Sequence, residues 1–230
     1  MLENISLTQL TLKNNMKTKL LSLFTALGLI TNAAIASSAS IGYTSDFFYR
    51  GEQKALESFQ SKIDYGTSIL GLDTAWHACT NQSVDQGVDS YGLSFAAGKS
   101  FSDGLLSAYV GFNHFEDVPG EALSEIFVQA GSNIVLNPSV SVYRNVDEEL
   151  FTYEGSISHS LDLKVASLNL DASAGNTEVT TSDNRTYYSV GAELARQIGA
   201  GVDAGLSVDL VDSDDIEREF VFGAALTFNF

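Results

Sequence analysis

The sequence predicts an all-β protein, a transmembrane antiparallel up-and-down β-barrel of twelve strands. Three observations predict this fold: an apolar export segment near the start, alternation of apolar and polar residues along most of the remaining chain, and a final strand with one aromatic face. After the export segment, no stretch is long and apolar enough for a membrane helix. A β-barrel and a periplasmic domain are therefore the classes to be compared.

Residues 1–36 are typical of a cleaved signal peptide. Lys17 and Lys19 precede the apolar run 20–30, and small residues follow it, which predicts cleavage before Ser37. The apolar run is too short to cross a bilayer as a helix. We therefore expect export across a membrane and removal of residues 1–36 from the mature chain.

Composition constrains the predicted barrel domain, residues 37–230. Met16 is an alternative start, in which case residues 1–15 are an N-terminal extension. The whole sequence has a formal net charge of −17 at pH 7, and the mature part is more acidic because residues 1–36 hold three lysines and one glutamate. Such a chain repels nucleic acid, so none is expected as a partner. The single cysteine, Cys79, excludes an internal disulfide and is expected at a strand end.

The first six predicted strands are 41–51, 59–65, 70–78, 91–97, 106–113 and 125–130. Each alternates apolar with polar residues, as a half-buried strand does. Their larger apolar members are Ile41, Tyr43, Phe47 and Tyr49; Phe59, Ile63 and Tyr65; Leu70, Leu72 and Trp76; Tyr91, Leu93 and Phe95; Leu106, Val110 and Phe112; Ile126 and Val128. Connections rich in polar residues or glycine separate the strands, at 52–56, 66–68, 80–89, 99–104 and 115–122.

The last six predicted strands are 139–143, 151–161, 168–172, 188–194, 202–210 and 218–230. Their larger apolar members are Val140 and Val142; Phe151, Tyr153, Ile157 and Leu161; Leu168 and Leu170; Tyr188, Val190 and Leu194; Val202, Leu206, Val208 and Leu210; Phe220, Phe222, Leu226, Phe228 and Phe230. The aromatic face of the final strand has no covering layer left in the sequence, and lipid supplies one. We expect Phe228 and Phe230 to act as the membrane-insertion signal, read by the barrel-assembly machinery, and the barrel to contact the lipid bilayer and lipopolysaccharide.

The connections also favour a barrel. Those after odd-numbered strands, at 80–89, 115–122, 175–185 and 211–217, are long or acidic, whereas those after even-numbered strands are mostly short. Short periplasmic turns and longer outer loops, with both termini in the periplasm, are typical of bacterial barrels. A periplasmic β-sandwich remains the alternative because its strands also alternate, but a sandwich favours a more varied core and a polar last strand.

Residues 42–51, GYTSDFFYRG, resemble the opening strand of the TorF family of porins, small outer-membrane barrels of Gram-negative bacteria. Residues 136–148, LNPSVSVYRNVDE, with the aromatic strand at 151–154, resemble a later hairpin of that family, and the C-terminal strand matches as well. The resemblance implies an outer-membrane barrel with a porin role and implies no substrate. The chain departs from the family after Gly51, where Glu52-Gln53-Lys54 replaces a run of hydroxyl and amide residues, so no role of that loop is carried over.

Taking the polar face of each strand as inward gives a lumen with ten acidic and two basic side chains. They are Asp46, Arg50, Lys62, Asp64, Asp73, Glu125, Glu154, Asp171, Glu193, Asp203, Asp209 and Glu219. One interpretation is that these groups solvate a narrow, wet interior. The other is that a negative lumen concentrates cations and excludes anions, as charged rings do in channels. The second predicts a porin or channel for passive diffusion of small solutes or ions, with a preference for cations.

Two further functions are weighed against a channel. A barrel plugged by its own side chains would serve as a structural or surface-interaction protein of the outer membrane. A barrel lipid hydrolase needs a serine, a histidine and an acid together. The local candidate is His159-Ser160 with Glu154 or Asp162, but neighbouring residues of a strand point to opposite sides. We therefore expect no catalytic residues and no cofactor, and the wide spacing of the three histidines predicts no metal site.

Overall fold

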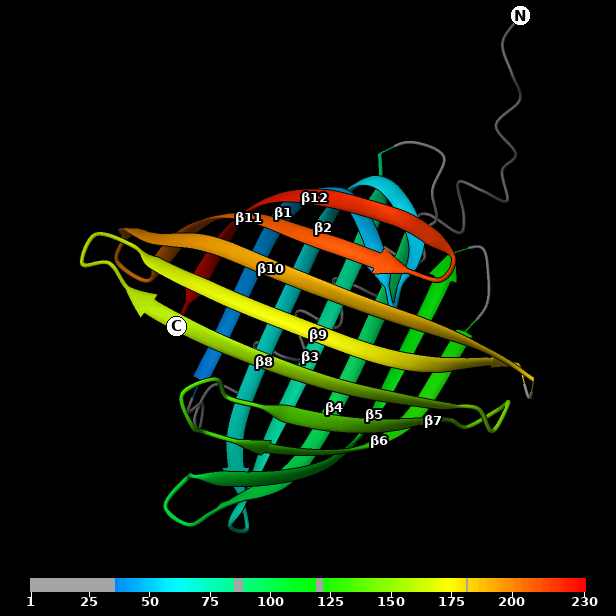
Figure 1. Ribbon diagram of the computed structural model, residues 1–230. Coiled ribbons are helices and arrows are strands. Elements are labelled where there is room, and N and C mark those ends of the chain that lie inside the picture. Colours follow the sequence, from blue (N-terminus) through cyan, green and yellow to red (C-terminus); the bar gives the residue numbers. More distant parts are fainter. Residues whose placement is uncertain (1–35, 85–88, 119–121, 181) are drawn as a thin grey trace, which may run out of the picture. The chain divides into compact units, whose positions relative to one another are not determined.

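The computed structural model describes residues 36–84, 89–118, 122–180 and 182–230. Within them, twelve β-strands each pair antiparallel with their neighbours in sequence, and β1 also pairs with β12, so that the sheet closes into a barrel (Figure 1). The predicted twelve-strand barrel is confirmed, and the β-sandwich alternative is wrong. The predicted signal peptide lies outside the described residues except for Ala36.

The strands are long enough to cross a membrane when tilted. They are β1 (Ala36–Tyr49), β2 (Glu52–Ile69), β3 (Leu72–Ser83), β4 (Asp89–Phe101), β5 (Leu106–Val118), β6 (Ala122–Ser132), β7 (Ser139–Asn145), β8 (Phe151–Asp162), β9 (Ser167–Thr180), β10 (Asp183–Gly199), β11 (Val202–Ser213) and β12 (Ile216–Asn229). A tilted strand needs about 9–11 residues to span, and of these strands β7 alone, with 7 residues, is shorter. Among the described residues no helix is long and apolar enough to cross a bilayer.

The outer face of the barrel is apolar and uncovered. On β12, Phe220 and Phe222 are 62% and 59% exposed, whereas Val221 between them is 6% exposed. Among the described residues most buried side chains are polar. The buried polar ones are Thr44, Ser58, Thr74, Asn81, Ser90, Glu125, Ser141, Thr152 and Ser213. A soluble domain buries apolar groups and exposes polar ones. The reverse arrangement here fits a barrel whose outer face meets lipid.

The seam that closes the barrel joins its first and last strands. Pairing of β1 with β12 runs as far as Thr44, opposite Gly223. At the other end of the seam, the Ser37 hydroxyl donates a hydrogen bond to the Phe230 carbonyl at 2.8 Å. The start of β1 and the end of β12 therefore lie side by side at one end of the barrel, as an even number of antiparallel strands requires.

Several predicted connections are strand in the structure. Residues 175–185 belong almost entirely to the β9–β10 hairpin, where pairs such as Thr177 with Arg185 continue the ladder. Connections at opposite ends of the barrel, 70–71 and 214–215, are equally short. The predicted length is therefore wrong for 175–185 and 211–217, because backbone hydrogen bonds extend the hairpins whether their side chains are polar or apolar. The predicted connections 80–89 and 115–122 include residues 85–88 and 119–121, which lie outside the described residues.

Three local predictions also need correction. The turn expected at 66–68 lies instead at Leu70–Gly71, where both residues have positive φ (55° and 78°), as a two-residue type I′ hairpin turn requires. The predicted connection 52–56 belongs to β2. Cys79 lies within β3 and not at a strand end.

Candidate functional site

Two cavities lie along the inner faces of β9 to β12. The smaller, of about 470 Å³, is bounded on one side by the β1–β2 hairpin and on the other by residues of β8 to β12. The larger, of about 820 Å³, lies toward the β8–β9 and β10–β11 turns. Glu193 and Gly205 line both cavities, so the two adjoin. Together they extend along the interior from the turns at that end of the barrel to the β1–β2 hairpin.

The outer part of the β1–β2 hairpin leaves the barrel wall. Pairing of β1 with β12 ends at Thr44, and pairing of β2 with β3 begins at Ser58. Residues 45–57, named here the hairpin tip, pair with each other and form ladder pairs with no third strand in the described chain. Glu57 has a φ of 37°, in the left-handed region that non-glycine residues seldom adopt, and it lies where the tip departs from β3.

The hairpin tip is tied to the opposite wall through Arg50. Its Nη2 donates to Glu125 Oε2 on β6 at 2.8 Å, and its Nη1 contacts the other carboxylate oxygen. Nη1 also lies 3.4 Å from Thr152 Oγ1 on β8, and the guanidinium lies 4.3 Å from the ring centroid of Tyr143 on β7. The Arg50 and Glu125 side chains are only 10% and 3% exposed. This bidentate pair is therefore shielded from water and well formed.

Electrostatics keep Arg50 charged in this buried position. Burial acts to lower the pKa of its guanidinium, but the hydrogen bond to Glu125 and the electrostatic interactions with Tyr49, Glu125 and Tyr187 together outweigh that effect. The pKa therefore lies above its ordinary value. An arginine held in this way neutralises Glu125 and contributes little free positive charge to the lumen.

Aromatic and backbone contacts complete the anchoring of the tip. The Tyr49 ring stacks on Phe115 of β5, with centroids 5.0 Å apart and planes 5° apart, and Phe47 lies 6.4 Å from the same ring. On the other side, the Ser213 hydroxyl of β11 donates to the Gly51 carbonyl at 2.8 Å. The expectation that Phe47 and Tyr49 face lipid is therefore wrong, because the tip turns inward and takes them with it.

Gly51 is required where the tip meets the wall. Its φ is 74°, and a Cβ at this position would lie 2.6 Å from Tyr187 Cβ and 2.7 Å from Ser213 Cβ. Both a left-handed backbone and a close approach thus exclude larger residues. The tip fits against β10 and β11 as closely as backbone allows.

Charged groups on the tip are paired as well. Lys54 Nζ lies 2.9 Å from Glu52 and 3.5 Å from Asp117 of β5, and Glu52 lies 3.3 Å from Arg185 of β10. Glu52 and Lys54 are two of the three positions at which the chain departs from the TorF pattern. Here they connect the tip to two strands on different sides of the barrel.

An acidic wall faces the tip from β9 to β11, and consists of Asp171, Glu193 and Asp209. Gly191 is the register partner of both aspartates, and a Cβ there would meet Asp209 and lie 2.7 Å from Asp171 Oδ1. The two carboxylates therefore lean into space that a side chain would fill. Asn169 donates to Glu193 at 2.9 Å. Among the described residues, no Lys, Arg or His forms an ion pair with these three acids.

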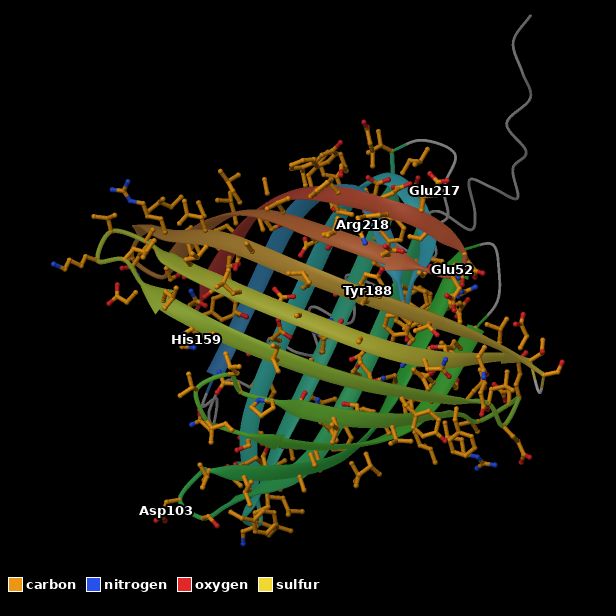
Figure 2. The ribbon with its side chains drawn as sticks, viewed as in Figure 1. Glu52, Asp103, His159, Tyr188, Glu217 and Arg218 are labelled. Atoms are coloured by element: carbon orange, nitrogen blue, oxygen red, sulfur yellow. The ribbon has the colours of Figure 1, made fainter. Side chains whose placement is uncertain are left out.

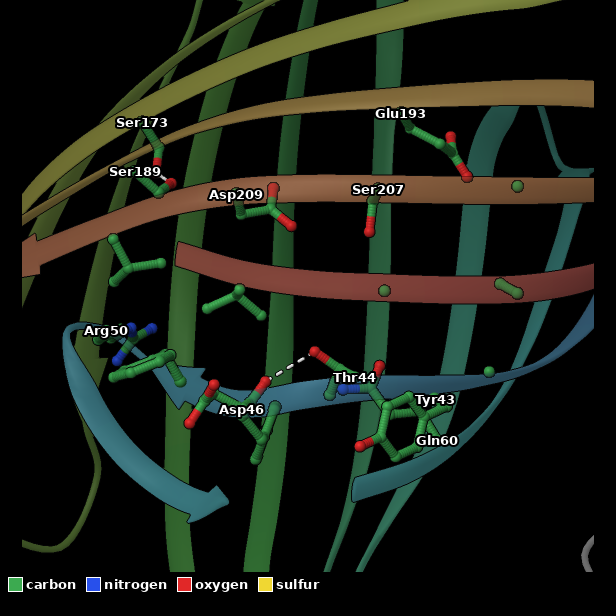
Figure 3. Close-up of a pocket in the computed structure, with 18 of the residues that line it drawn as sticks. Tyr43, Thr44, Asp46, Arg50, Gln60, Ser173, Ser189, Glu193, Ser207 and Asp209 are labelled. Carbon is green, nitrogen blue, oxygen red and sulfur yellow. Dashed lines mark hydrogen bonds between the residues drawn. The ribbon is translucent and has the colours of Figure 1, made fainter. Parts of the chain in front are cut away.

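The structure separates the twelve predicted lumen residues into groups. Asp46, Arg50, Lys62, Glu154, Glu193 and Asp209 line the smaller cavity, and Glu193 and Asp203 line the larger. Asp171 belongs to the acidic wall, and Glu125 holds Arg50. Asp64 (bonded to His77), Asp73 (bonded to Ser68) and Glu219 (opposite Val211) line neither cavity. Figure 3 shows Thr44 and Asp46 on β1 and, across the cavity, Ser207 and Asp209.

Sequence reasoning missed the residues that fix the tip to the wall. They are Glu52, Lys54, Asp117, Tyr143, Thr152, Arg185, Tyr187 and Ser213. Each looks like an ordinary strand or connection residue in the sequence. The available signal was local: three aromatic residues, Phe47, Phe48 and Tyr49, and then an arginine precede the glycine that ends the first predicted strand.

The serine and histidine weighed as a hydrolase pair do not meet. The Ser160 hydroxyl donates to Asn169 Oδ1 at 2.8 Å, on the side of the strand that leads to Glu193. His159, labelled in Figure 2, is the register partner of Leu170 on the opposite side. Among the described residues, no group of three or more His, Cys, Asp and Glu side chains is arranged to hold a metal ion.

Comparison with known proteins gives a fold and no closer relationship. No protein-family model and no curated protein matches the sequence. The solved KdgM porin aligns with a TM-score of 0.55 at 11% identity, over 84% of this chain and 99% of that one. An outer membrane channel from Pseudomonas putida F1 aligns with a TM-score of 0.56 at 9% identity, over 87% of this chain and 98% of that one. The NanC porin aligns with a TM-score of 0.55 at 9% identity, over 84% of this chain and 99% of that one.

At these identities the likeness concerns the fold. The class defined by the fold and lumen is that of porin-like outer-membrane β-barrels.

Proposed function

We propose that this protein is an outer-membrane porin that lets small solutes and ions diffuse passively, with a preference for cations. The observation that carries the proposal is the acidic wall of Asp171, Glu193 and Asp209, beside two adjoining cavities inside a closed barrel. Unpaired carboxylates in a confined interior raise the local cation concentration and repel anions. The porin-like fold and the apolar outer face support a place in the outer membrane.

The charge of the interior bears on which solutes this barrel would accept. A KdgM porin was solved in complex with disordered oligogalacturonate, an acidic oligosaccharide. The smaller cavity of the present barrel is lined by four acids, Asp46, Glu154, Glu193 and Asp209, with Lys62 and the paired Arg50. We therefore propose that acidic sugars are poor solutes for this barrel, and that cations or neutral polar molecules are better ones.

The test is the reversal potential of residues 37–230 refolded into planar bilayers under a salt gradient. We expect a cation-selective potential, which shifts toward zero in the triple variant D171N/E193Q/D209N. The matched control is D103N/D147N/E217Q, which removes the same charge from exposed turn and strand-end positions, two of them labelled in Figure 2. Selectivity for anions, or equal shifts in both variants, would contradict the role of the acidic wall.

The inward hairpin tip favours a second candidate function. If the tip closes the lumen completely, the barrel is a structural or surface-interaction protein of the outer membrane, and its outer turns are its working surface. Swelling of liposomes in small sugars separates the two functions. An open porin admits the sugars and the liposomes swell, whereas a plugged barrel leaves them unchanged.

We also propose three properties that follow from the sequence. Membership of the TorF family rests on residues 42–51 and 136–148, the first of which contribute one arm of the inward hairpin. Phe228 and Phe230, 37% and 76% exposed, serve as the insertion signal for the assembly machinery.

The protein has no hydrolase activity, because Ser160 and His159 lie on opposite sides of β8. Phospholipid hydrolysis by the purified barrel that disappears in Ser160→Ala would overturn the last of these.

A further inference from the structure

Five of the eight charged or aromatic residues of the hairpin tip contact side chains on distant strands, and they are Phe47, Tyr49, Arg50, Glu52 and Lys54. We propose that residues 45–57 form the constriction of the channel, and that they confine the open path to the acidic wall of β9 to β11. The proposal rests on the porin function and deepens it. It names Arg50 as the residue that positions the constriction, and small cations as the solutes it passes.

The contacts of the tip span the lumen. On one side they reach β5 through Phe115 and Asp117, and β6 through Glu125. On the other side they reach β10 through Arg185 and β11 through Ser213. A segment that touches strands so far apart around a barrel must cross its interior.

The position of the tip determines what remains for a solute. The half of the lumen near β5 to β8 is occupied by the Arg50 guanidinium, the Tyr49 ring and their partners, all in direct contact. The smaller cavity lies on the other side, between the base of the hairpin and β8 to β12. A solute that passes the tip there must move along the acidic wall.

The charges make this asymmetry selective. Arg50 and Lys54 on the tip are paired with Glu125 and with Glu52 and Asp117. The acids of the wall have no such partners among the described residues. Lys62 is the cation of the smaller cavity that no described ion pair engages. The field across the constriction is therefore negative, and it attracts small cations while a large or acidic solute is excluded by size and charge.

The same geometry assigns a positioning role to Arg50. It does not line the path as a free charge, but it fixes the tip against β6, β7 and β8 through Glu125, Tyr143 and Thr152. Loss of the guanidinium should release the tip, which widens the path and weakens its selectivity. If Arg50 only stabilised the fold, loss of its guanidinium would lower the free energy of unfolding and leave the conductance per channel unchanged.

The experiment compares four full-length barrels in a Cys79→Ser background. They are the parent, a variant in which residues 46–56 are replaced by a two-residue Asn-Gly turn, Arg50→Gln, and the control Arg144→Gln, which breaks a more exposed ion pair with Glu149. Heat-dependent mobility in gel electrophoresis verifies folding of each. Single-channel conductance and reversal potential are then measured in planar bilayers.

A second measurement reports the position of the tip without any current. Thr152→Cys, at a site that is 3% exposed beneath Arg50, is added to each barrel and labelled with a membrane-impermeant maleimide. A group covered by a closed segment reacts only in its open fraction, so we expect labelling on the order of ten-fold faster without the tip. Arg50→Gln should give an intermediate rate, and Arg144→Gln the parental rate.

The outcomes separate this proposal from the porin function. Higher conductance and weaker cation selectivity in the variant without the tip support the constriction. A parent that does not conduct, together with a variant without the tip that does, supports a tip that closes the channel completely. Equal conductance with and without the tip overturns the constriction and leaves the porin function standing. If neither the parent nor the variant without the tip conducts, both the constriction and the porin function are overturned. Equal labelling of the introduced thiol in the parent and the tip-less variant overturns the inward position of the tip.

Discussion

The two arms of the barrel seam carry similar aromatic patterns and place them in opposite surroundings. On β12, Phe220 and Phe222 point outward and remain exposed, while Phe47 and Tyr49 on β1 pack inside the barrel against Phe115. β12 continues to pair with β11 along its whole length, whereas β1 loses its pairing with β12 after Thr44. Alternation thus determines the two faces of a strand, but lateral pairing determines whether those faces are the inside and outside of the barrel.

The largest expected effect comes from breaking the ion pair that holds the inward arm. Arg50→Ala leaves the Glu125 carboxylate buried without its partner, which costs about 3–5 kcal/mol of unfolding free energy. Urea titration of the barrel in lipid vesicles measures it. Arg144→Ala, in which the arginine side chain is 41% exposed, should cost no more than about 1 kcal/mol.

A rescue variant sharpens this result. R50M/E125L replaces the pair with apolar side chains of similar size, and such replacements of buried pairs are often close to neutral. We expect the double variant to be more stable than Arg50→Ala alone. If it is equally unstable, the loss comes from packing and not from the stranded charge.

The next effect tests the outward arm. Phe222→Arg places a cation on the lipid face near the middle of β12, which costs about 2–4 kcal/mol in a bilayer barrel. Thr227→Arg, on the same strand but lining the larger cavity, should be much better tolerated. Similar losses for the two variants, measured by reversible unfolding in vesicles, would mean that the faces of β12 are not lipid and lumen.

The smallest effect compares an aromatic pair inside the barrel with one outside. A double-mutant cycle on Tyr49 and Phe115 should give a coupling of about 0.5–1.5 kcal/mol, and one on Tyr43 and Phe59 a similar value from an edge contact at 5.6 Å. Removal of Arg50 should reduce the first coupling, because the tip is released, and leave the second unchanged. A first coupling that survives the loss of Arg50 would show that the tip is held without it.

The sequence was sufficient for the parts of the fold that depend on local pattern. Strand number, antiparallel order and the aromatic outer face of residues 218–230 all follow from a period of two and from turn residues. The ends of the strands could not be predicted from the sequence. In hairpins such as β9–β10, backbone pairing continues through polar residues that resemble a loop.

The candidate site was less predictable for a physical reason. The acids of the wall follow from alternation along β9 to β11, so Asp171, Glu193 and Asp209 were already candidates. The inward tip depends instead on contacts between residues 75 and 102 positions apart, Arg50 with Glu125 and with Thr152. No periodicity reports such a contact, and the predicted outward placement of Tyr49 was wrong for that reason.

The seam between β1 and β12 has a consequence for biogenesis. Ser37 and Phe230, which are joined by a hydrogen bond, are 193 positions apart, so the ladder that closes the barrel joins segments far apart in the sequence. Until β1 pairs with β12, the two edge strands of the sheet expose unpaired backbone amides and carbonyls. Such groups promote aggregation in water and are strongly unfavourable in the hydrocarbon core of a bilayer. We therefore expect the exported chain to need protection of these edges until the barrel closes.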